Sequence, residues 1–301
     1  MLNIGIVGCG NWSLTVIKEL EKNEYFNFNS IFCRNYLTKN LNFEKKIKLY
    51  ENIEKFFSNN KLDCVYVAGN PILNLQVVKL STKKRIPLIL EKPISNSYNN
   101  AKKIQLLADK NQLIIIPNLT NYFSDSFYFL KNYIEENYNE IKKIIVYEGN
   151  NGPFRKNIHP IWDWGFHSFS TLLKIFESKK ISKITKKELK SSKLYPNAIV
   201  SKFMFNVDSK FQVKLVTGNL FKKKIRKIKI ILKNNNILES DMIDHRIFIN
   251  QNIVFKNKSK PLQSLLNIFK KTIKEKDTNF SKNLINLSCE TTKILENFYN
   301  C

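Results

Sequence analysis

Two short segments carry side chains that can move a proton or stabilise a developing charge. Lys92 lies in Glu91-Lys92-Pro93, and His167 ends the run Asp163-Trp164-Gly165-Phe166-His167. Imidazole has a reference pKa of about 6.5, which suits a base that takes a hydroxyl proton. A lysine ammonium group can stabilise charge on an alkoxide or ketone oxygen. The pair therefore fits alcohol oxidation, with hydride passing to a nicotinamide. The other interpretation of His167 is a structural histidine beside two tryptophans.

A glycine-containing segment near the start of the chain has the spacing of a phosphate-binding turn. It follows the apolar run at residues 2–7 and precedes a helical pattern. Dinucleotide-binding turns use three glycines, and here Ser13 stands at the third place. The diphosphate would bind backbone N–H groups at the helix N terminus; the alternative is a tight turn without a ligand. The expected cofactor contacts in this segment are Gly8, Gly10, Asn11 and Trp12.

The residue after the second β-prone run, residues 29–33, bears on the choice between NAD and NADP. NAD-binding sites usually place Asp or Glu about 20 residues beyond the glycines, where it binds the ribose hydroxyls. This chain has Arg34 in that region. Because a guanidinium group can bind a 2′-phosphate, Arg34 favours NADP over NAD. The alternative is a surface arginine in a basic protein.

The elements that must position these residues are predicted by an alternation of short apolar runs and helical patterns over the first 120 residues. Runs that are apolar throughout are typical of strands buried on both faces of a parallel sheet. Three of them end in polar or proline-containing breaks, at the sheet edge where ligands bind in such folds. Asn70, Pro71 and Glu91 therefore join Lys92 as expected cofactor contacts. The runs are at 2–7, 29–33, 62–68, 87–90 and 113–116.

The pattern changes after residue 122. A helix near 123–137 and a strand at 141–148 are followed by β-like runs from 181 to 256 and a helical tail from Pro261. We therefore expect an α/β chain: a Rossmann-type parallel sheet domain at 1–122, then an α+β domain at 123–301 with a largely antiparallel open sheet. The C-terminal helices are expected to pack back on the first domain.

The charge balance is strongly basic, with 50 Lys and Arg against 25 Asp and Glu, a formal net charge of +25. Such a balance can indicate nucleic-acid binding. However, the lysines are scattered and accompany a similar excess of Asn and Ile, as an AT-rich coding bias would produce. The densest basic run, at 221–229, alternates with apolar residues and predicts a strand with a solvated face. A partner other than nucleic acid is therefore expected.

Cysteine usage and hydropathy indicate the environment. The five cysteines form no CxxC pair, which argues against a disulfide framework and a structural zinc site. No apolar run approaches the roughly 20 residues of a membrane span. No metal site is predicted from the spacing of His, Cys, Asp or Glu. The expectation is a cytoplasmic enzyme with reduced thiols at residues 9, 33, 64, 289 and 301.

Taken in order, the motifs at 5–12, 91–93 and 163–167 resemble the Gfo/Idh/MocA family, the relatives of glucose–fructose oxidoreductase and inositol dehydrogenase. The resemblance implies that Lys92 lies beside the nicotinamide and that His167 is the acid or base. Asp163 would then bind the substrate or orient the histidine. It also implies a sugar substrate and a homo-oligomer, either a dimer or a tetramer.

The loop at 152–155 is similar to branches of the family that act on nucleotide-linked sugars. This similarity places Arg155 among the expected substrate contacts. Trp162 and Trp164 could stack on a sugar ring, which makes Trp164 an expected contact too; the other interpretation of both tryptophans is packing in the core. Two departures support a different hypothesis. Asn74 replaces a frequent histidine of the family, and Ser168 replaces an aspartate that is common in the nucleotide-sugar branches. The alternative function is therefore a catalytically silent member of the family that only binds a nucleotide.

Overall fold

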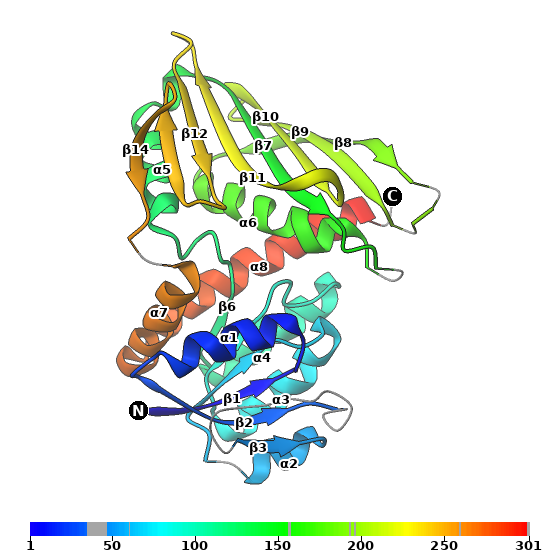
Figure 1. Cartoon of the computed structure of the whole chain (residues 1–301), viewed down its shortest axis with the longest axis vertical. Helices are drawn as coiled ribbons and strands as arrows, with labels where there is room; N and C mark the ends of the chain where they lie inside the picture. Colours follow the sequence, from blue (N-terminus) through cyan, green and yellow to red (C-terminus); the bar gives the residue numbers. More distant parts are fainter. Residues whose placement is uncertain are drawn as a thin grey trace. The chain divides into compact units, whose positions relative to one another are not determined.

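The computed structural model describes residues 1–34, 47–59, 61–155, 158–192, 194–195, 197–258 and 260–299. The chain forms two compact units (Figure 1). Unit 1 contains residues 1–118 and 262–293, and unit 2 contains residues 119–261 and the chain from residue 294. The first change of unit thus falls at 118/119, beside the 122/123 boundary expected from the sequence. None of the described helices is long and apolar enough to cross a lipid bilayer.

Unit 1 is built on a six-stranded sheet in the order β3-β2-β1-β4-β5-β6. All five neighbouring pairs are parallel, as the apolar runs predicted. The edge strand β3 was not predicted, because its three residues are mostly exposed and lack an apolar run. The strands are β1 (Leu2–Val7), β2 (Phe26–Phe32), β3 (Lys48–Tyr50), β4 (Cys64–Val67), β5 (Leu88–Leu90) and β6 (Ile115–Pro117).

Four helices of unit 1, α1 to α4, lie between successive strands as crossover connections, so the sheet is doubly wound, and α7 and α8 join the unit from the end of the chain. From β1, the strands β2 and β3 continue toward one edge of the sheet, and β4, β5 and β6 continue toward the other edge. In such folds, ligands bind at the carboxyl ends of the strands, beside the point where the order reverses. The helices are α1 (Asn11–Glu21), α2 (Ile53–Asn59), α3 (Asn74–Lys84), α4 (Tyr98–Asn111), α7 (Pro261–Glu275) and α8 (Thr278–Tyr299).

Helix α8 contributes to the cores of both units. In unit 1, the Ser281 hydroxyl donates to the Ile115 carbonyl at 2.9 Å and accepts from the Ile115 N–H at 2.8 Å. The Cys289 thiol donates to the carbonyl of Ala101. In unit 2, the Phe298 ring lies 5.3 Å from the Phe203 ring, centre to centre. A single helix therefore belongs to two hydrophobic cores.

Unit 2 contains an eight-stranded sheet in the order β14-β13-β12-β11-β7-β10-β9-β8. Only the β7–β10 pair is parallel, so the prediction of a largely antiparallel sheet is confirmed. The strands are β7 (Ile141–Asn151), β8 (Ile181–Ser191), β9 (Ile199–Val207), β10 (Phe211–Gly218), β11 (Leu220–Leu232), β12 (Ile237–Asp241), β13 (Arg246–Ile249) and β14 (Asn252–Lys256).

One face of this sheet carries the core of unit 2, with α5 (Asp125–Glu136) and α6 (Phe166–Ile175) in the same unit. Phe169 of α6 packs edge-on against Phe203 of β9, with ring centres 5.2 Å apart. Along β11, Ile228 and Ile230 are buried, whereas the lysines between and beside them are only partly buried. This period of two gives β11 a core face and a more exposed face.

Candidate functional site

The glycine turn of unit 1 has the geometry that a diphosphate needs. Gly8 has φ +112°, and a Cβ there would lie 2.9 Å from the backbone of Gly69, so only glycine fits. A Cβ on Gly10 would meet no atom within 4 Å, so open space adjoins the first turn of α1. The N-cap residue of α1 is Gly10, which makes no side-chain cap, so it leaves the first N–H groups of the helix available. Ser13 is fully buried, as a small residue at the third place should be.

A cavity of about 320 Å³ opens beside this turn, at the carboxyl edge of the sheet. It brings together four predicted cofactor contacts from three separate segments of the chain. These are Gly8, Gly10, Arg34 and Asn70. The cavity thus combines helix N–H groups with one guanidinium group, and both favour an anion. The donor set fits a dinucleotide.

Cys9 and Cys33 line the same cavity and are joined by a disulfide bond, with their Cα atoms 5.6 Å apart. The expectation of reduced thiols is therefore wrong for this pair. The cause lies in the fold. Parallel pairing of β1 with β2 brings the ends of the two strands together, and Gly8 N–H donates to the Phe32 carbonyl at 2.9 Å. Two cysteines that are distant in sequence become direct neighbours.

Glu91 is the centre of a hydrogen-bond network that joins α1 to three strand ends. Its Oε1 accepts from Trp12 Nε1, from the Tyr66 hydroxyl at 2.5 Å and from Asn118 Nδ2 at 2.6 Å. Burial raises the pKa of Glu91, while the hydrogen bond from Tyr66 acts in the opposite direction. Trp12 and Glu91, both predicted to contact the cofactor, therefore bind each other. Their contact with a cofactor stays a prediction.

This network fixes the backbone that carries Lys92. The Glu91 N–H donates to the Val67 carbonyl at 2.9 Å, so Glu91, which directly follows β5, is held at the carboxyl edge with Lys92 next to it in the chain. On the other side of the motif, buried Asn74 donates through Nδ2 to the Ile94 carbonyl at 3.0 Å. Asn74, the departure from the family pattern, thus holds the chain two residues beyond the lysine.

The turn after β4 begins at Asn70, whose Oδ1 accepts from the Ile72 N–H at 3.1 Å. This contact caps the short 3₁₀ helix η2 (Pro71–Leu73). Asn70 lines the cavity, whereas Pro71 does not. The role of Pro71 in cofactor binding stays a prediction, and its position at the start of η2 has a local reason, because proline suits the first turn of a helix.

In unit 2, the predicted segment around His167 forms a π-helical turn, η4 (Ile161–Gly165), which runs into α6. Such turns occur frequently at functional sites. The His167 side chain is buried at 6% exposure, and its carbonyl accepts from the hydroxyls of Ser170 and Thr171 at 3.0 and 2.7 Å. Since Lys92 lies in unit 1 and His167 in unit 2, their action on one substrate stays a prediction.

Two expected substrate contacts form an ion pair. Arg155 Nη1 lies 3.2 Å from Asp163 Oδ1, with the arginine side chain 50% exposed and the carboxylate 21%. Trp164 is partly buried, and its Nε1 has no hydrogen-bond partner among the described residues. Trp162 is buried, and its ring lies 6.3 Å from that of Tyr299, in keeping with the interpretation that it packs in the core.

A buried pair of opposite charges next to α6 was missed by the sequence interpretation. Glu148 on β7 lies opposite Arg226 on β11, and Arg226 Nε is 2.9 Å from Glu148 Oε1. Ser168, the second departure from the family pattern, donates its hydroxyl to Glu148 Oε2 at 2.5 Å. The available signal was a carboxylate at a core-facing position of an alternating strand. Its partner depends on the register of strands far apart in sequence.

The other two histidines, His159 and His245, both have lowered pKa values. Burial lowers the pKa of His159 to about 4, with a further lowering by the charge of Lys186. Its Nδ1 accepts from the Ile161 N–H at 3.2 Å, so the ring supports the start of η4. Burial also lowers the pKa of His245, and the charge of Arg226 acts in the same direction.

Comparison with known proteins agrees with this geometry. Residues 2–119 match a family model described as an oxidoreductase family with an NAD-binding Rossmann fold. This part of the chain is therefore an NAD-binding domain of oxidoreductase type. For this part of the chain, the resemblance to the Gfo/Idh/MocA family predicted from the motifs at 5–12 and 91–93 is confirmed. No curated protein matches the sequence significantly.

Solved structures with a similar fold cover nearly the whole chain. A proposed oxidoreductase from Magnetospirillum magnetotacticum MS-1 has a TM-score of 0.84 at 15% identity, covering 98% of both chains. UDP-N-acetylglucosamine 3-dehydrogenase from Acidithiobacillus ferrooxidans has a TM-score of 0.77 at 11% identity, covering 99% of this chain and 98% of that one. Scyllo-inositol dehydrogenase from Lactobacillus casei, with bound NAD(H) and scyllo-inositol, has a TM-score of 0.72 at 15% identity, covering 98% and 94%. At these identities the likeness establishes the fold.

Proposed function

We propose that the protein is an NAD(P)-dependent oxidoreductase that transfers hydride between a nicotinamide and a hydroxyl or ketone carbon of a sugar or nucleotide sugar. The observation that carries the proposal is the cavity beside the glycine turn, at the carboxyl edge of the sheet, where β5 ends at Leu90, two residues before Lys92. The family supports the oxidoreductase class. The named dehydrogenases with the same fold support the choice of a polyol or sugar substrate.

The roles of the chain's own residues follow from their chemistry. The bound cofactor would supply or accept the hydride. Helix N–H groups at Gly10 and the start of α1 would hold its diphosphate. The Lys92 ammonium group would stabilise negative charge on the substrate oxygen, and His167 would accept or return the hydroxyl proton. The Arg155–Asp163 pair would contact the other hydroxyl groups of the substrate.

NADP is the proposed cofactor form. Among the described residues that line the cavity, Arg34 carries a charge and none carries a carboxylate. Cys33, which ends the second strand, is held in the disulfide and offers no acceptor comparable to the Asp or Glu that binds a ribose. A guanidinium group without a competing carboxylate favours a 2′-phosphate.

Fluorescence titration with NADPH and NADH, followed by turnover assays, tests the proposal. The substrate panel should contain scyllo-inositol, N-acetylglucosamine and UDP-N-acetylglucosamine. Lys92→Met is expected to keep NADPH affinity within a few-fold and to abolish turnover, because cofactor binding does not need the ammonium group and catalysis does. Lys110→Met, the same charge change on an exposed face of α4, is the matched control. Full activity of Lys92→Met would refute the assigned role.

The alternative is a family member that binds the nucleotide without turnover. It rests on the two departures from the family pattern, Asn74 and Ser168. Both have structural partners here, the Ile94 carbonyl and the Glu148 carboxylate. Cofactor binding without hydride transfer to any member of the panel would favour this alternative.

A further inference from the structure

A row of polar side chains crosses the core-facing side of the unit 2 sheet. In register, Ser201 of β9 lies beside Thr217 of β10, Thr217 beside Glu148 of β7, and Glu148 beside Arg226 of β11. The adjacent row on the same face is apolar throughout. That row is Phe203, Leu215, Val146 and Ile228. A change from an apolar row to a polar row marks the point where the core of the sheet ends.

The polar row lies beneath the segment that carries the predicted catalytic histidine. Ser168, the residue after His167, donates to Glu148. A Cβ on Gly165 would lie 3.5 Å from Thr217 Cγ2, so the start of α6 packs directly on the row. The hydroxyl oxygens of Ser201 and Thr217 are buried and have no hydrogen-bond partner among the described residues. Unpartnered buried polar groups are rare in cores and call for a ligand or water.

Positive charge exceeds negative charge at the β11 end of this row. Glu148 forms an ion pair with Arg226, whose side chain is 16% exposed. Lys224 lies two residues earlier on the same strand and is exposed. Partial desolvation and the charge of Arg226 lower its pKa, whereas the charge of Glu148 raises it. Within the described part of the chain, Lys224 forms no ion pair. The nearby Asp241 and Asp244 are already paired, with Lys227 and Arg246.

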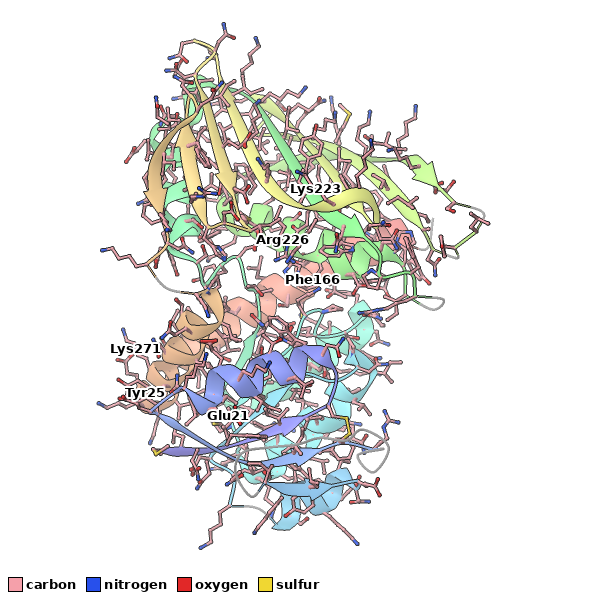
Figure 2. All side chains as sticks on the ribbon, viewed as in Figure 1. Glu21, Tyr25, Phe166, Lys223, Arg226 and Lys271 are labelled. Carbon is pink, nitrogen blue, oxygen red and sulfur yellow. A yellow bond between two sulfur atoms is a disulfide. The ribbon has the colours of Figure 1, made fainter. Side chains whose placement is uncertain are left out.

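The guanidinium group of Arg226 retains donors for a second anion. Its contact with Glu148 uses Nε, and an arginine has five N–H donors. Figure 2 labels Arg226, together with Phe166 at the start of α6. The Trp164 ring lies 5.9 Å from the guanidinium carbon, and its Nε1 is a buried donor without a partner among the described residues. These donors come from β11 and η4, which are separate elements of unit 2.

We propose that Arg226, with Lys224 and Trp164, binds an oxyanion group of the substrate, either a phosphate of a nucleotide sugar or the carboxylate of a sugar acid. This inference rests on the proposed function, because it assigns a substrate class to that site. A planar fork of donors matches the oxygens of both groups, and a low-exposure setting strengthens the contact. Binding would place the neutral part of the ligand toward Asp163 and His167, which lie on either side of Trp164 in η4 and α6.

Calorimetric titration of the full-length protein, saturated with NADPH so that its cofactor cavity is filled, tests the inference. The probes are UDP for the phosphate and D-glucuronate for the carboxylate, with uridine and N-acetylglucosamine as neutral controls. At least one anionic probe is expected to bind. Arg226→Met should weaken it about 10- to 100-fold, the effect of losing a charge-assisted hydrogen bond. Lys224→Met should weaken it several-fold.

Lys229→Met is the matched control, because it makes the same charge change on the same strand at a position three residues from Arg226, on the opposite face of the sheet. Its probe affinity should equal that of the wild type. Arg226→Met could fail to fold, because it leaves Glu148 buried and unpaired. The double variant Glu148→Gln/Arg226→Met then replaces it, because it removes both charges of the pair. Lys224→Met is a second test that leaves the Glu148–Arg226 pair intact. Equal affinity for the probe in Lys224→Met and Lys229→Met would overturn the proposal.

The two proposals fail in different ways. NADPH binding and turnover, with no affinity for either anionic probe, would overturn the oxyanion site and leave the oxidoreductase function intact. Absence of NADPH binding and turnover would overturn the proposed function. In that case, probe binding that Arg226→Met weakens and Lys229→Met does not would still support an oxyanion site in unit 2, because Arg34 and the cofactor cavity lie in unit 1.

Discussion

Replacement of Cys9 and Cys33 by alanine is expected to lower the free energy of unfolding of unit 1 by about 3.5 kcal/mol. The disulfide closes a loop with a sequence separation of 24. The chain-entropy relation for cross-linked unfolded chains gives about 3.5 kcal/mol for a loop of this length at 25 °C. The effect acts mainly on the unfolded chain, so it should appear although the two alanines disturb few native contacts.

Urea unfolding followed by tryptophan fluorescence measures this change in one unit. Of the three tryptophans in the chain, Trp12 lies in unit 1, and Trp162 and Trp164 lie in unit 2. In a Trp162→Phe/Trp164→Phe background, the signal therefore reports the unfolding of unit 1. The alanine pair should move the transition to lower urea without changing its slope, because the surface exposed on unfolding is nearly the same.

Reduction provides the internal control for this experiment. Dithiothreitol should move the transition of the intact chain by the same amount and leave the alanine pair unchanged. Burial raises the pKa of the Cys64 thiol and raises that of Cys289 to about 12, so these two thiols should react slowly. Equal stability of the intact chain and the alanine pair under oxidising conditions, with five reactive thiols after denaturation, would refute the reasoning.

Three further predictions concern single side chains. Tyr66→Phe removes a buried donor to Glu91 and should destabilise unit 1 by about 1–3 kcal/mol in the same urea assay, the usual effect of an unmet buried hydrogen bond; an unchanged midpoint would contradict the network. The His159 pKa should be about 4 by NMR titration. Because the pKa of His159 is lower in the folded than in the unfolded chain, the contribution of its neutral side chain to the free energy of unfolding is complete above about pH 6.5 and is lost as the pH falls toward 4. His159→Gln should therefore make Tm fall less steeply as the pH is lowered through this range. Arg34→Asp should lower NADPH affinity about tenfold or more and spare NADH, as fluorescence titration would show; an unchanged NADPH preference would argue against a 2′-phosphate contact.

Much of unit 1 could be predicted from the sequence because its signals are local. The central strands are apolar runs that end in glycine or proline, and each is buried on both sides of the sheet. The glycine turn is a contiguous segment, so Gly8 and Gly10 could be assigned from spacing alone. Strand β3 escaped prediction because an exposed edge strand of three residues has no apolar run.

The features that escaped prediction depend on register between distant segments. The disulfide exists because β1 and β2 end side by side, and the Glu148–Arg226 pair exists because β7 and β11 are neighbours in the sheet. Neither pairing is encoded in the spacing of the residues involved. Trp12 follows the glycine turn and Glu91 lies at the edge of the sheet, but nothing in their sequence positions indicates that they bind each other.

Helix α8 has a consequence for how the protein is made. The ribosome completes both sheets before it reaches Thr278, yet Ser281 supplies hydrogen bonds to β6, and Phe298 fills a place beside β9. Multidomain chains commonly fold one domain at a time as they emerge during translation. Here each nascent domain would keep part of its apolar interior exposed until helix α8 has left the ribosome exit tunnel and completed both cores.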